Sequence, residues 1–206
     1  MKKISTLALA SLFVTSVACA QAPVFTTLST SGKNVFAGVK LESKGNEPET
    51  YLLQVSGDAL TSSKISLPSE LSAREVVALF PAEKNMLVVM SQRTIEQGDK
   101  PQFHSYDPAS KKWSKLAESD CVSFAKIKVE KSAVTLSCVE TNAKGEEVES
   151  QKKVALKGVT LVQPGDISLP MAKSQNDGLK AELLGDTFEW NKLKVVQKEK
   201  EKVFTP

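Results

Sequence analysis

Two cysteines, Cys121 and Cys138, are the residues of this sequence whose type and spacing most directly permit chemistry. They bound an 18-residue stretch in which apolar side chains recur at alternate positions in both halves. A chain reversal at Val129 to Lys131 would fold the two halves into a β-hairpin and bring both sulfurs to its open end. We therefore predict a disulfide. We expect it to be structural, because the sequence has no Cys-x-x-Cys motif and no histidine beside either thiol.

A single histidine, His104, is available for acid–base catalysis. It stands in the run Gln-Phe-His-Ser-Tyr, where alternation predicts a strand with His104 and Tyr106 on one face. Ser–His–Asp catalysis would need a serine on a nucleophile elbow, and the sequence contains no Gly-x-Ser-x-Gly. No two carboxylates are singled out for glycoside hydrolysis, and no set of ligands converges on a metal. The sequence thus predicts no catalytic residue, no metal site and no cofactor.

Aromatic residues and the C-terminal tail supply the candidate binding positions. Tyr106 and Trp113 flank the turn that Asp107-Pro108 opens, with His104 close by on the same strand. Trp113 fits two hypotheses, a packing residue of the core or an exposed anchor for a partner. The tail alternates Lys and Glu before it reaches Val203 and Phe204. This pattern predicts either an edge strand protected by charge or a docking arm that adds to a partner's sheet.

The elements that must position these residues are strands. From Val24 onward, short runs rich in Val, Ile, Leu, Phe and Thr are separated by Gly, Pro, Asn and Asp, and no long amphipathic helical repeat occurs. The runs fall into a four-strand order that repeats about every 50 residues, which is the period of a propeller blade. The predicted strands are Val24–Leu28, Asn34–Leu41, Tyr51–Val55 and Lys64–Leu67 in the first unit; Arg74–Phe80, Asn85–Ser91, Gln102–Tyr106 and Lys112–Leu116 in the second; and Val122–Val129, Ala133–Val139, Glu147–Val154 and Val159–Val162 in the third.

We therefore expect an all-β fold of antiparallel meanders, arranged as a small or incomplete β-propeller. Residues Leu179 to Phe204 would form a fourth, incomplete unit. A β-sandwich is the alternative. Within the second unit, the stretch from Tyr106-Asp107-Pro108 through Trp113 to Leu116 resembles the Tyr-Asp-Pro…Trp…Leu stretch of kelch repeats. The resemblance implies a blade-like hairpin at this place only, since the kelch double glycine is absent.

The N-terminus has the pattern of an export signal. Met1-Lys2-Lys3 precedes an uncharged, mostly apolar run to Ala18, and Ala18-Cys19-Ala20 matches a signal-peptidase site. We predict a signal peptide at residues 1–20 and a single all-β domain at 21–206 in the periplasm, or secreted. The segment ending at Cys19 also resembles a lipoprotein lipobox, although Ser16 stands where Leu, Val or Ile is usual. A lipid anchor at Cys19 is therefore the alternative. No second apolar stretch reaches transmembrane length.

The balance of charged residues helps to exclude one class of function, nucleic-acid binding. Loss of Lys2 and Lys3 would leave 25 basic against 24 acidic residues, with lysines and glutamates interspersed, which argues against nucleic-acid binding. We expect a non-enzymatic periplasmic module that binds another envelope protein, for example an accessory factor of an envelope-spanning machine such as a secretion system. The alternatives are an inhibitor of a hydrolase, a carboxylate-dependent glycan or cell-wall hydrolase, and a carrier of a small ligand.

Overall fold

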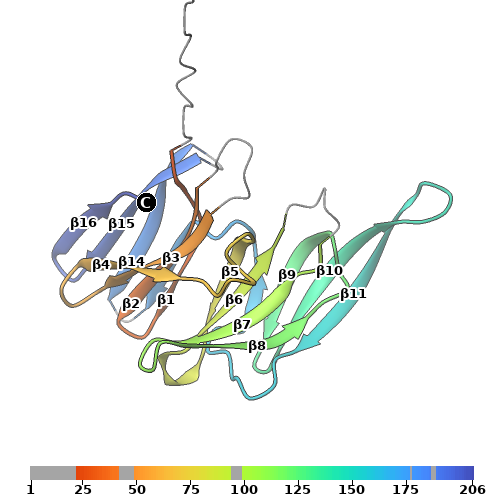
Figure 1. Cartoon of the computed structure of the whole chain (residues 1–206), viewed down its shortest axis with the longest axis horizontal. Coiled ribbons are helices and arrows are strands. Elements are labelled where there is room, and N and C mark those ends of the chain that lie inside the picture. Colours follow the sequence, from red (N-terminus) through yellow and green to blue (C-terminus); the bar gives the residue numbers. More distant parts are fainter. Residues whose placement is uncertain (1–21, 42–48, 94–98, 177, 187–188) are drawn as a thin grey trace, which may run out of the picture.

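The computed structural model describes residues 22–41, 49–93, 99–176, 178–186 and 189–206, and antiparallel β-strands make up most of it (Figure 1). The predicted signal peptide and Cys19 lie outside the described residues. The strands are β1 (Val24–Ser31), β2 (Asn34–Leu41), β3 (Glu49–Ser56), β4 (Thr61–Ser66), β5 (Glu75–Pro81), β6 (Leu87–Gln92), β7 (Gln102–Asp107), β8 (Lys112–Glu118), β9 (Phe124–Glu130), β10 (Ala133–Thr141), β11 (Glu147–Ala155), β12 (Gly165–Ile167), β13 (Lys173–Asn176), β14 (Leu179–Asp186), β15 (Glu189–Gln197) and β16 (Lys200–Phe204). The described residues include one 3-10 turn, Glu83–Asn85, and no helix long and apolar enough to cross a membrane.

The strands form four units of four, which confirms the all-β fold and its blade-like meanders. Unit 1 (β1–β4), unit 2 (β5–β8) and unit 4 (β13–β16) each run strand to neighbouring strand, whereas unit 3 has the order β11-β10-β9-β12. Units 1 and 4 count as one eight-stranded sheet because β1 and β15 share a single residue pair, Phe25 and Trp190. The described residues do not form the two facing sheets of a β-sandwich.

The third and fourth units differ from the sequence-based expectation. We predicted a fourth strand of unit 3 at Val159–Val162, but Leu161 instead bridges Ala82 of unit 2, and β12 adds to the opposite edge of the unit, beside β9. The reason is burial: Leu156, Val159 and Leu161 all enter the core between units 2 and 3. The chain therefore turns inward after β11. In unit 4, β13 supplies a strand that the sequence did not reveal.

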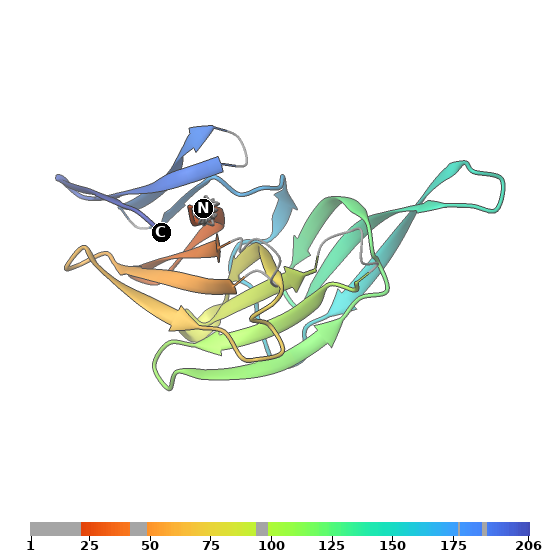
Figure 2. The ribbon, with the colours of Figure 1, turned by 45° about the horizontal axis from the view of Figure 1, so that its top comes forward.

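Three apolar cores hold the units in a row. One core joins units 4 and 1, a second joins units 1 and 2, and a third joins units 2 and 3. The spatial order is thus 4–1–2–3, and Figure 2 shows the sheets following one another in this order. No core cluster formed by the described residues contains strands of both unit 3 and unit 4, so the row has two end sheets.

Strand β2 lies in the middle of this row and is buried on both faces. Val35, Ala37 and Val39 face unit 4, while Phe36 points into the core shared with unit 2. Gly38 lets β2 approach that second sheet closely. A Cβ atom at this position would lie 2.5 Å from Thr26 Oγ1 and 3.0 Å from Val76 Cβ, so any larger residue would have to displace these side chains. Residues Val35–Val39 accordingly form a continuous apolar run without alternation, as expected for a strand covered on both sides.

The disulfide between Cys121 and Cys138 is present, with 5.5 Å between the two Cα atoms. Cys138 lies on β10, and Cys121 lies in the segment that leads into β9. Both cysteines are fully buried in the core between units 2 and 3, beside Leu136 and Phe103. The bond therefore closes the open end of the β9–β10 hairpin and fixes it against the neighbouring sheet.

We predict that the mature protein contains no free thiol and that replacing both cysteines with alanine lowers the free energy of unfolding by about 3 kcal/mol, the loop-closure value for a loop of this size. Urea melts of the wild type and of the Cys121→Ala/Cys138→Ala variant measure the loss. The reduced wild type serves as the control, because it lacks the bond but keeps the side chains. Two labelled thiols in the unfolded, unreduced protein would contradict the prediction.

Candidate functional site

The residues singled out in the sequence lie in two regions of the structure. His104, Tyr106 and Trp113 belong to β7 and β8 of unit 2, and Val203 and Phe204 belong to β16 of unit 4. The structure does not bring the two groups together, because unit 1 lies between units 2 and 4.

His104 is buried inside unit 2 with 1% of its surface exposed. Its Nε2 lies 3.1 Å from Oε1 of Glu70, and its Nδ1 has no hydrogen-bond partner among the described residues. Burial lowers the pKa of His104 below its usual value, and the nearby Glu70 carboxylate offsets part of that effect. The histidine therefore belongs to the packed interior, where it cannot meet a macromolecular partner.

Tyr106 and Trp113 are directly paired across β7 and β8, as the predicted hairpin requires. Their ring centroids are 4.8 Å apart with the ring planes tilted by 38°. Tyr106 is buried in the core between units 1 and 2, whereas Trp113 covers the edge of that core and is only partly buried. Trp113 is thus both a packing residue and the one member of this group with surface left for contact.

Val203 and Phe204 point to opposite sides of β16, because neighbouring residues of a strand alternate between faces. Phe204 is buried in the core between units 4 and 1, while Val203 is 45% exposed. Among the described residues, β16 pairs only with β15, so it is an edge strand, as one of the two sequence-based hypotheses expected. Phe204 stabilises the fold, and only Val203 stays a candidate for contact with a partner.

The exposed side of unit 4, turned away from unit 1, is called here the outer face. Register places the chain of neighbours Lys173, Glu182, Lys194 and Val203 across its four strands. A second row runs Gln175, Lys180, Val196 and Glu201. Basic, acidic and apolar groups thus alternate over the outer face, and its apolar positions lie next to lysines.

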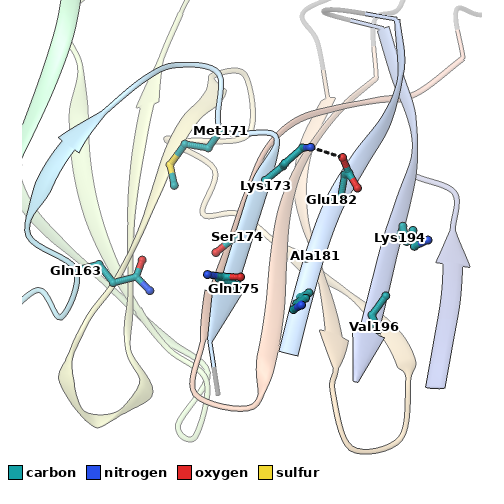
Figure 3. Close-up of a pocket in the computed structure, with 10 residues that line it drawn as sticks. Gln163, Met171, Lys173, Ser174, Gln175, Ala181, Glu182, Lys194 and Val196 are labelled. Carbon is teal, nitrogen blue, oxygen red and sulfur yellow. Dashed lines mark ion pairs between the residues drawn. The ribbon is translucent and has the colours of Figure 1, made fainter. Parts of the chain in front are cut away.

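A cavity of about 620 Å³ opens on this outer face (Figure 3). Strands β13, β14 and β15 form one wall, and Gln163 and Met171, from the chain on either side of β12, lie opposite. The cavity therefore occupies the place where units 3 and 4 come nearest without sharing a core. Its lining is Gln163, Met171, Lys173, Ser174, Gln175, Lys180, Ala181, Glu182, Lys194 and Val196.

Two of the three lysines in the cavity lining form ion pairs with glutamates on neighbouring strands. Lys173 Nζ lies 2.8 Å from Glu182 Oε1, and Lys194 Nζ lies 2.8 Å from Glu201 Oε2. Lys180 forms no ion pair with any described residue. Glu182 is the single carboxylate in the lining and is held by a lysine, so the cavity lacks the facing pair of carboxylates that glycoside hydrolysis uses.

Sequence reasoning missed this cavity because its residues carry no motif. Lysines and glutamates at alternate positions of a strand look the same whether they face open solvent or line a cavity. Only the alternation of residues along the tail indicated which side chains share the outer face. On β15 it places Lys192, Lys194 and Val196 on one face and the buried Leu193 and Val195 on the other. Among the described residues, no group of three His, Cys, Asp or Glu could hold a metal ion.

Comparison with known proteins gives no family. No protein-family model matches the sequence, and no curated protein matches it. Among solved structures, the chain is similar to the β-propeller domain of the Trilobed protease from Pyrococcus furiosus, at 8% identity and a TM-score of 0.43, covering 89% of this chain and 58% of that one. It is also similar to the acylaminoacyl peptidase of Pyrococcus horikoshii, at 8% identity and a TM-score of 0.47, covering 88% of this chain and 32% of that one.

A third similar structure is a PL25 polysaccharide lyase that acts as an ulvan lyase. The identity is 12% and the TM-score 0.40, with 91% of this chain and 55% of the lyase covered. The chain thus spans between a third and three fifths of the length of these proteins.

We predict that Trp113→Ala lowers the free energy of unfolding by about 2 kcal/mol, roughly half the cost of truncating a fully buried tryptophan, because only part of the indole is buried. Denaturant melts of wild type and variant give the value. Trp113→Phe is the matched control, since it keeps a ring against Tyr106 and should lose less. A loss below about 1 kcal/mol would contradict a packing role.

The lowered pKa of His104 predicts a loss of stability in mild acid. The unfolded chain takes up the histidine proton as the pH falls through about 6.5, while the folded protein resists protonation, so this contribution is complete above that pH and declines below it. Urea melts at about pH 7.5 and about pH 5.5 should show a smaller decline for His104→Gln than for wild type. Equal declines in the two proteins would be inconsistent with the assignment.

Proposed function

We propose that the protein is an exported, non-enzymatic binding module that docks another envelope protein on the outer face of unit 4. The observation that carries this proposal is that unit 4 ends the row of sheets. Its inner face is covered by unit 1, but its outer face has no apolar core over it among the described residues and exposes Val203. Val203 shares this face with the partly buried Leu184 and Val196. Apolar area surrounded by charged residues is the arrangement by which an exposed sheet can bind a protein.

The other end sheet is a weaker candidate. The outward side of unit 3 carries Lys126, Lys128 and Glu149, all exposed, and its strands β9 and β10 present Thr135 and Ser137 beside the lysines. Val139 lies on the same side and is partly buried, but polar and charged groups surround it, so this composition suits a solvated face. Unit 4 combines its charges with Leu184, Val196 and Val203, so it offers apolar area to a partner as well as charge.

The enzyme and carrier alternatives have less support. A carboxylate-dependent hydrolase would need two facing carboxylates in a cleft, and the cavity lining offers Glu182 alone, held by Lys173. A carrier of a small apolar ligand would need a cavity with few charged groups, whereas three lysines and a glutamate line this one. The predicted export signal would bring the protein into the envelope. We therefore include in this proposal a role as an accessory factor of an envelope-spanning assembly, such as a secretion system.

The test is affinity capture from envelope extract with matched valine variants. We expect the mature protein to capture a defined partner and Val203→Asp to lose it, because a buried carboxylate would be desolvated at the interface. Val148→Asp is the control, since Val148 is 46% exposed on β11 and lies in unit 3. Melting curves of both variants verify folding. Equal capture by wild type and Val203→Asp would exclude docking on the outer face.

A further inference from the structure

The cavity beside the outer face has the size and chemistry of a recognition site. Its volume of about 620 Å³ falls within the range of ligand sites. Its lining carries three lysines, Lys173, Lys180 and Lys194, and one glutamate, Glu182, so the net charge of the lining is positive. The apolar groups Met171 and Val196 lie in the same lining and offer contact to an apolar side chain.

The charges of the cavity are not equivalent. Lys173 and Lys194 already have carboxylate partners, Glu182 and Glu201, at 2.8 Å each. Lys180 has no such partner among the described residues, although register puts it between Gln175 and Val196 on the neighbouring strands. A carboxylate entering the cavity would therefore pair with Lys180, and Lys173 and Lys194 would add longer-range attraction.

The remaining lining suits an extended chain. Gln163 and Gln175 lie on different walls, and each amide can donate and accept a hydrogen bond, as the backbone of a peptide requires. Val203 pairs in register with Lys194, so the exposed valine directly continues the wall of the cavity onto β16. A segment that places an acidic side chain in the cavity would reach Val203 with its next residues.

We propose that the cavity takes an acidic, partly apolar peptide segment of the docking partner, with a carboxylate of that segment paired to Lys180. This inference rests on the proposed function and adds the chemistry of the partner to it. Charge complementarity selects the acidic side chains, and the contact with Met171, Val196 and Val203 selects apolar neighbours for them.

A carbodiimide cross-link on the captured complex tests the contact, since this reagent forms an amide without a spacer and so joins a lysine amine only to a carboxylate that can come into direct contact with it. We expect cross-linked peptides that join Lys180, Lys173 or Lys194 to an aspartate or glutamate of the partner. Cross-links restricted to lysines of unit 3, in a complex that Val203→Asp still disrupts, would overturn the inference and leave the proposed function standing.

Charge reversal gives the second measurement. We expect Lys180→Glu to weaken partner binding about tenfold or more at low salt and to flatten its salt dependence, because one ion pair becomes a repulsion. Lys144→Glu, at the exposed turn between β10 and β11, is the control and should leave binding unchanged. Unchanged affinity of Lys180→Glu would overturn the inference. If no partner is captured at all, the proposed function fails and the inference fails with it.

A glycan is the competing occupant, because uronic acids also carry carboxylates. The probe is a trimer of galacturonic acid, added to wild type and to Lys180→Glu in a direct binding measurement. Binding of the trimer to wild type and its loss in Lys180→Glu, without any cross-link to a partner carboxylate, would replace the peptide by an acidic sugar and overturn the proposal. Absence of trimer binding, with the expected cross-links, supports the peptide.

Discussion

Burial of both faces of the β1–β4 sheet is the constraint on which the rest of the structure depends. One face of β2 packs on unit 4 and the other on unit 2, and Gly38 sets how closely the second sheet can approach. A single β-meander cannot cover its own apolar faces, so a sheet that is apolar on both sides, like unit 1, needs a neighbour on each side. Because units 4 and 2 pack on the two faces of unit 1, and unit 3 packs on unit 2, the four units form a row. Units 4 and 3 are the two ends of this row.

Units 3 and 4, at the two ends of the row, each have one sheet face without a neighbouring sheet among the described residues, and they differ in how that sheet is stabilised. In unit 3, the disulfide ties Cys121 to β10 behind the sheet, while the outward side is polar. In unit 4, ion pairs such as Lys173 with Glu182 run between neighbouring strands and keep the outer face charged. Charged side chains on an exposed sheet prevent pairing with chance neighbours. They also give such a face selectivity, because a partner must match the pattern of charges to displace water from it.

Much of the fold could be predicted from alternation, since the apolar runs of units 1 and 2 coincide with their strands. The prediction failed where contacts between distant parts of the chain, and not the local alternation of apolar residues, determine the structure. β13 reads Lys-Ser-Gln-Asn and has no apolar alternation, yet it is held by β14 and by the hydroxyl contact of Ser174 with Thr30. Leu161 was assigned to an outer strand because propensity does not reveal that it is buried under unit 3. The cavity on the outer face was not predicted, because its lysines come together only through the pairing register of β13, β14 and β15. The fold sets that register, and the sequence of each strand does not reveal it.

The order of the units in space has a consequence for the timing of folding. Unit 4 is synthesised last, but it covers the first unit, and the contact between Thr30 and Ser174 spans 144 residues of chain. At the usual rates of synthesis, the N-terminal sheet waits about 10–30 s before its covering strands exist. Until then one apolar face of unit 1 is bare, so the molecule cannot complete its fold early.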